Sequence, residues 1–148
     1  MVAETYSGFA QRYNMMIGVL VCALVTNILF LILPIGIFII ADIFLVVGSC
    51  TGLHLAFRYR KESQSHIKTG IIVGLSGSVL SLLLISCFDW IFYYILAYGF
   101  DFFLFLQYTL ILFAYYGIIF VLIGIIIGYL YGSHYKKRDY ADKETPLF

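Results

Sequence analysis

Charge is scarce in this chain of 148 residues: Asp, Glu, Lys and Arg make up 11% of it, and hydrophobic residues make up 63%. A soluble domain of this length has too little interior to bury so much apolar surface, so the solvent of most of the chain must be lipid. A net charge of only +1 argues against nucleic acid as a partner. We therefore expect a multi-pass membrane protein, which in a prokaryote would lie in the cell membrane.

Cysteine is also rare, and its placement excludes two classes of site. Cys22, Cys50 and Cys87 all lie inside apolar runs and form no C-x-x-C pair, so neither a disulfide framework nor a zinc site is indicated. The histidines show no metal-ligand spacing either. We expect no metal and no cofactor.

Four long apolar runs remain once the few breaks are marked. Pro34 closes the first run, and AYGFDFF, around Gly99 and Asp101, is the only convincing turn in the second half. Residues 1–14 are polar without an Arg/Lys-rich start or an A-x-A exit, so we interpret them as a retained cytoplasmic segment rather than a cleaved signal. The predicted spans are residues 15–33, 35–57, 69–97 and 102–131.

The distribution of basic residues sets the number of spans and their orientation. No Lys or Arg occurs between positions 69 and 131. With four helices all basic residues fall on one side of the membrane, whereas a fifth helix would move the KKRD tail outside. The predicted fold is therefore all-α, an integral membrane four-helix bundle with both termini in the cytoplasm. Residues 132–148 would form a cytoplasmic tail of mixed charge.

Small residues line one face of each of the last three predicted helices. In lipid, such faces let helix backbones approach closely. These stripes would serve packing inside the bundle, or one of them, most readily that of the fourth helix, would bind a second protomer or a larger partner. The glycines predicted to pack helices are Gly48, Gly52, Gly70, Gly74, Gly117, Gly124, Gly128 and Gly132.

A single acid, Asp42, interrupts the second apolar run, IFIIADIFLVV. A charge deep in a bilayer is costly, and such residues usually face the bundle interior. Because no Lys or Arg is available there, we expect an uncharged Asp42 held by hydrogen bonds in a polar layer. The alternative is a proton or cation site. Counting from the turn at Pro34 and from the inner ends places these candidate partners at its level: Thr26, Asn27, Ser86, Tyr115 and Tyr116.

One short motif bears on catalysis. GLSG, residues 74–77, resembles the G-x-S-G nucleophile motif of rhomboid intramembrane proteases. That resemblance implies a six-helix core and a histidine on a later helix. Here two helices are missing, and no histidine lies between Ser76 and the tail. We expect no enzyme activity.

The polar loop RYRKESQSHIK and the tail are basic where they meet the membrane. This fixes topology and would also bind anionic lipid headgroups. The residues concerned are Arg58, Arg60, Lys61, Lys136, Lys137 and Arg138. The leading hypothesis is a small non-catalytic membrane protein that acts by helix association, as a homo-oligomer or as an accessory subunit of a membrane complex. The alternative is an oligomeric proton or cation channel or transporter that uses Asp42.

Overall fold

The computed structural model describes residues 11–32, 38–61 and 63–144, and over these residues the chain is helical, without strands. The helix bounds confirm the all-α prediction. A π-helix, η1, continues α4, and a single turn, α5, follows it. The elements are α2 (Asn14–Ile32), α3 (Phe38–Arg58), α4 (His66–Asp89), η1 (Trp90–Ile95), α5 (Leu96–Tyr98) and α6 (Phe102–Glu144).

Within the described residues, three helical stretches are long and apolar enough to cross a membrane: Asn14–Ile32, His66–Phe92 and Phe102–Tyr140. Large apolar side chains cover the outside of the molecule, as with Phe103, which is 81% exposed. Inside, apolar clusters around Leu82 and Leu53 lie beside buried small and polar side chains such as Ser78 and Thr26. An exterior so rich in large apolar side chains suits a chain surrounded by hydrocarbon.

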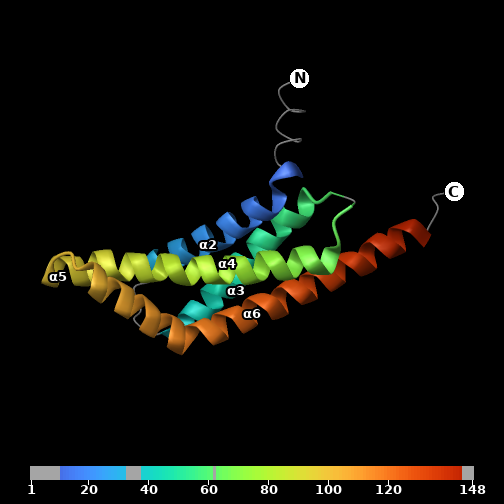
Figure 1. Cartoon of the computed structure of the whole chain (residues 1–148). Coiled ribbons are helices and arrows are strands. Elements are labelled where there is room, and N and C mark those ends of the chain that lie inside the picture. The colour runs from blue at the N-terminus through green and yellow to red at the C-terminus, as the bar shows by residue number, and fades with distance from the viewer. Residues whose placement is uncertain (1–10, 33–37, 62, 145–148) are drawn as a thin grey trace, which may run out of the picture.

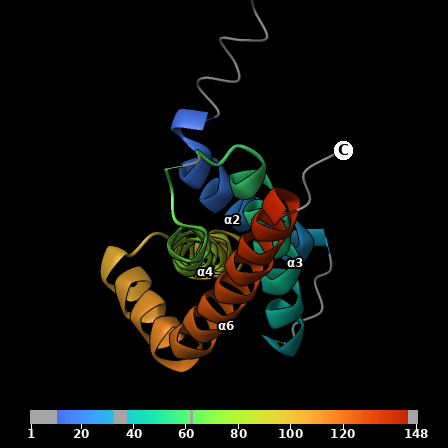
Figure 2. The ribbon, with the colours of Figure 1, turned by 90° about the vertical axis from the view of Figure 1, so that its right-hand side faces the viewer.

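The helices form two antiparallel pairs that pack side by side (Figures 1 and 2). Helix α2 pairs with α3 and α4 with α6, while α4 also contacts both members of the first pair. The start of α2, the α3–α4 connection and the end of α6 lie at one end of the molecule, and α5 lies at the other (Figure 1). We call these the basic end, which holds residues 58–68, and the α5 end.

The turn between α4 and α6 lies where the sequence predicted it. Gly99 has a φ of 77°, the left-handed region that favours glycine. The Asp101 side chain then caps α6, because its Oδ1 accepts hydrogen bonds from the backbone N–H groups of Phe103 (2.8 Å) and Leu104 (3.2 Å).

Helix α6 is longer than any predicted span. Its 43 residues correspond to about 64 Å at about 1.5 Å per residue, twice the thickness of a hydrocarbon core. We expected the fourth span to end at Tyr131, but the helix continues without a break to Glu144. The membrane boundary near residue 131 is therefore not a helix end. Both views also show α6 bent in its orange section (Figures 1 and 2).

Candidate functional site

Buried polar side chains gather where α2, α3 and α4 meet, and most of them bond to their own helix. Thr26 Oγ1 donates to Cys22 O (2.8 Å), Ser78 Oγ to Gly74 O (2.6 Å) and Ser81 Oγ to Gly77 O (2.7 Å). Asn27 Nδ2 donates to Ala23 O (2.8 Å) and, across the interface, to Ser81 O (3.3 Å). Asn27 Oδ1 has no partner among the described residues. This polar layer joins helices, and it contains no charged group.

Asp42 is not part of that layer. It is half-buried, and it forms no hydrogen bond with another described residue. Thr26 instead faces Phe44, to whose carbonyl its hydroxyl donates at 3.4 Å. The predicted pairing of Asp42 with Thr26 and Asn27 is therefore wrong by two positions.

The contacts between α2 and α3 explain this error. The prediction took Pro34 as the midpoint of the hairpin, whereas Gly48 packs on Cys22 and Phe44 contacts Thr26, two pairs whose midpoint is position 35. Asp42 lies near the α5 end of its helix, about 6 Å from the helix start and about 24 Å from Arg58 at 1.5 Å per residue. An acid at that level is closer to the headgroups, where its charge costs less than at the bilayer centre.

The other candidates for the polar layer also lie apart from Asp42. Ser86 Oγ is 2.7 Å from Thr109 Oγ1, a contact between α4 and α6. Tyr116 packs against the apolar cluster around Leu82. Tyr115 is 74% exposed on the opposite side of α6.

Glycines lie at the closest approaches between helices. A Cβ on Gly70 or Gly74 of α4 would overlap the carbonyl oxygen of Gly128 or Gly124 of α6, and one on Gly132 would lie 2.8 Å from His66 O. In the other pair, Gly48 and Gly52 of α3 face α2 in the same manner. A Cβ on Gly48 would lie 2.6 Å from Cys22 O, and one on Gly52 would overlap Gly18 O. Gly117 differs, since a Cβ there would meet nothing closer than 3.5 Å. The small face of α6 from Gly124 to Gly132 is thus occupied by α4 of the same chain.

Charged side chains meet at the basic end. Asp139 of α6 accepts from Arg60 (3.0 Å) and lies 2.6 Å from His66 Nε2. Arg60 also donates to the carbonyls of Lys61 and Gln64. Because Arg60 is engaged in this way, it is a poorer lipid contact than predicted. Of the other residues predicted to bind lipid, Lys61 is half-buried and four are exposed: Arg58, Lys136, Lys137 and Arg138.

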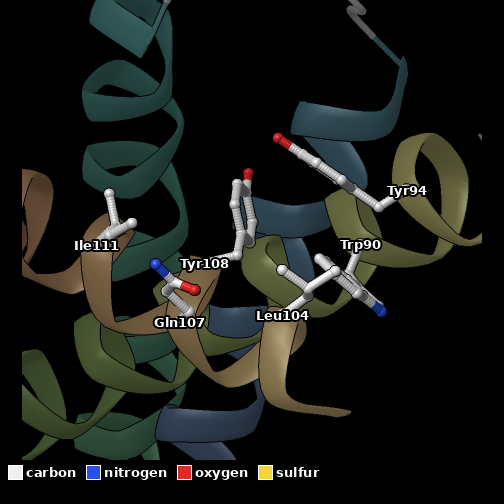
Figure 3. Close-up of a pocket in the computed structure, with 6 residues that line it drawn as sticks. All are labelled: Trp90, Tyr94, Leu104, Gln107, Tyr108 and Ile111. Atoms are coloured by element: carbon white, nitrogen blue, oxygen red, sulfur yellow. The ribbon is translucent and has the colours of Figure 1, made fainter. Parts of the chain in front are cut away.

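A cavity of about 370 Å³ opens at the α5 end, between the start of α6 and the end of α4 with η1. Its lining is mostly aromatic and aliphatic, with one amide (Figure 3): Trp90, Tyr94, Leu104, Gln107, Tyr108 and Ile111. Tyr108 of this lining also donates a hydrogen bond from its hydroxyl to Asp89 Oδ2 at 3.0 Å.

We did not predict this cavity, although the sequence held a signal for it. In the hairpin of α4 and α6, contacting residues are mirrored about Gly99: Gly70 meets Gly128, and Asp89 meets Tyr108. The same reflection applied to the sequence would have placed position 109, the neighbour of Tyr108, opposite Asp89.

Comparison of the chain with protein-family models, with curated proteins and with solved structures found no match. The polar layer, the charged cluster at the basic end and the cavity at the α5 end are therefore the features from which a function must be derived.

Proposed function

We propose that this chain is a non-catalytic four-helix membrane protein with both termini in the cytoplasm, which acts by binding another transmembrane helix as a homo-oligomer or accessory subunit. In this arrangement α3 is the fourth span, and the basic end faces the cytoplasm. The exposed part of α6 would form the contact.

The observation that carries this proposal is the position of the Tyr115 hydroxyl. Tyr115 is 74% exposed, and it has no hydrogen-bond partner among the described residues. It lies about 20 Å along α6 from Phe102 at about 1.5 Å per residue, near the midpoint of the predicted span 102–131, so its ring would lie within the hydrocarbon of a bilayer. A hydroxyl left unpaired in hydrocarbon costs about 1–3 kcal/mol, which a neighbouring helix with a hydrogen-bond acceptor would relieve.

The residues around Tyr115 have the spacing of a helix-packing seam. Exposed large side chains recur along one side of α6 at intervals of three and four, as in the a and d positions of a coiled coil. Ala114, next to Tyr115, is small and also exposed, which would allow close approach. The members of this seam are Ile111, Tyr115, Ile118, Leu122, Ile126 and Tyr129.

The test is the mass of the complex in nanodiscs prepared from its native membrane, followed by substitution at the seam. We expect wild-type protein to run as an oligomer or with a larger partner. Tyr115→Phe should weaken the assembly about fivefold, and Tyr115→Ala more, since a membrane hydrogen bond contributes about 1 kcal/mol. Leu24→Ala, at a lipid-facing position of α2 that is 53% exposed, is the matched control and should change nothing.

A monomeric wild-type protein, or equal weakening by Leu24→Ala and Tyr115→Ala, would contradict the proposal. The channel hypothesis built on Asp42 gains no support from the geometry, because Asp42 lies outside the polar layer. A cation flux into liposomes that is present in the wild-type protein and absent in Asp42→Asn would nevertheless support the channel hypothesis and contradict a role limited to helix association.

A further inference from the structure

Asp89 is an acid without a basic counterpart. Asp89 is only 9% exposed, and its one side-chain hydrogen bond with a described residue comes from the neutral Tyr108 hydroxyl. No described Lys, Arg or His forms an ion pair with it. In the sequence every Lys and Arg lies at position 12, from 58 to 68 or from 136 to 143, and the described members of these groups belong to the basic end. Unlike Asp42, Asp89 accepts a hydrogen bond, and its ionised form would be stabilised by a cation from outside the chain.

Three aromatic rings form a cluster that contacts this acid through the Tyr108 hydroxyl. The ring centroids of Trp90 and Tyr94 are 5.0 Å apart with nearly parallel planes, and Tyr108 lies 5.0 Å from Tyr94 and 6.1 Å from Trp90 at an inclined angle. In Figure 3 the hydroxyls of Tyr94 and Tyr108 lie on the same side of the cavity, while the Trp90 nitrogen points away from Tyr108. A ligand bound in this cavity would therefore contact ring carbons and not the indole N–H.

The backbone at this place is unusual as well. Trp90 and Tyr94 both belong to the π-helix η1, a wider helix that occurs mostly as short segments and frequently at functional sites. It continues α4 beyond Asp89, and it brings the two rings into the stack that forms one wall of the cavity.

We propose that this cavity binds an alkylated ammonium group, such as a trimethylammonium, against the accessible ring faces of Tyr94 and Tyr108 and in the field of Asp89, while Trp90, only 4% exposed, packs beneath Tyr94. Ring faces carry negative electrostatic potential and attract cations, quaternary ammonium groups among them. An inorganic cation is a poor fit, because the lining offers few oxygen ligands for it. An anion would be repelled by Asp89, and a purely apolar ligand would leave the acid without a counter-ion.

The chain provides its own reporter for this binding. Trp90 is the only tryptophan, so the intrinsic indole emission of the protein comes from the wall of the cavity. The full chain is reconstituted in nanodiscs of phosphatidylglycerol, whose headgroup has no ammonium. The protein is titrated with choline and, in a separate experiment, with 3,3-dimethyl-1-butanol, the uncharged isostere of choline. We expect a saturable change of the Trp90 emission with choline and none with the alcohol.

Two substitutions with a matched control locate the effect. Asp89→Asn should weaken choline binding about tenfold or more, because it removes a charge close to the ligand. Tyr94→Leu should weaken it about fivefold, since it removes one ring face from a partly exposed position. Asp101→Asn removes an acid at the same end while keeping a residue that caps helices well, so it should leave the titration unchanged.

The same titration in phosphatidylcholine nanodiscs distinguishes two sources of the ligand. A shift of the choline curve to higher concentration would identify the lipid headgroup as a competitor, and an unchanged curve would indicate a soluble ammonium compound. The proposal is overturned if choline gives no saturable change, if the alcohol acts equally, or if Asp89→Asn binds like Asp101→Asn. Ile111 belongs to both the cavity lining and the Tyr115 seam, but choline binding and the mass of the complex are separate measurements, so the failure of one proposal is distinguishable from the failure of the other.

Discussion

Gly128 and Gly117 lie on the same helix, but they have different surroundings. At Gly128 an added Cβ would overlap the carbonyl oxygen of Gly70, which is backbone and cannot rotate away. At Gly117 the nearest atoms belong to the Phe113 and Leu82 side chains, at 3.5 Å or more. One added methyl group therefore separates α4 from α6 in the first case and fits in the second.

We expect Gly128→Ala to reduce the free energy of unfolding by about 1–3 kcal/mol, the usual cost of overpacking, and Gly117→Ala to change it by less than about 1 kcal/mol. Unfolding by a titration of denaturing detergent measures both. Equal effects of the two substitutions would mean that the close approach of α4 and α6 contributes little to stability.

The sequence predicts some residue positions better than others, for physical reasons. Gly99 was predictable because a turn in an apolar run needs a residue that tolerates positive φ. Hydrophobicity and length likewise predict α2, α4 and the start of α6. The level of Asp42 was missed because the contacts between α2 and α3 are centred one residue after Pro34, and a shift of one in the centre moves each partner by two. The cavity depends on a tertiary contact, Asp89 with Tyr108, which only a reflection of α4 onto α6 about their turn could have indicated.

Among the elements, α6 extends furthest beyond its expected bounds, and the charged cluster at the basic end holds this extension in place. Asp139 connects α6 to Arg60 in the α3–α4 connection and to His66 at the start of α4. Phe57 of α3 stacks on Tyr135 of α6 with centroids 4.8 Å apart. The last turns of α6 are thus anchored to two other elements.

We expect Asp139→Ala to release these turns and to speed tryptic cleavage after Lys136, Lys137 and Arg138. The loss of global stability should be small, at most about 1 kcal/mol, because the Asp139 side chain is 44% exposed and solvent screens the pair. High salt should reduce the difference from wild type. Leu130→Ala, at a position of the same helix that is 60% exposed, is the control. Equal cleavage of both variants would show that the stacked rings alone hold the segment.

At the level of the whole molecule, the basic residues are confined to one end. The described Lys and Arg residues lie at the start of α2, in and beside the α3–α4 connection and in the last part of α6, where Asp139 also lies, whereas the acids Asp42, Asp89 and Asp101 lie towards the α5 end. The positive-inside rule counts Lys and Arg, and it therefore favours an orientation with the basic end in the cytoplasm.

Single cysteines test this orientation in a background where Cys22, Cys50 and Cys87 are replaced by alanine. In right-side-out vesicles, an impermeant maleimide should label Phe100→Cys and should not reach Ser63→Cys until the membrane is opened. Both positions are exposed in the structure, so lack of reaction would reflect sidedness and not burial. The reverse pattern would invert the topology, and labelling of both in sealed vesicles would mean that the chain crosses the membrane an even number of times, or not at all, between the two positions.

The hydroxyls of Thr26, Ser78 and Ser81, and the Asn27 amide, each donate to a carbonyl one turn back in their own helix. Because these bonds are intrahelical, α2 and α4 can enter the bilayer with most of their polar groups already satisfied, before any partner helix has arrived. During biosynthesis each would be stable as a lone segment leaving the translocon. Assembly would then consist of lateral docking of preformed helices, limited by the fit of small faces and not by the desolvation of polar side chains.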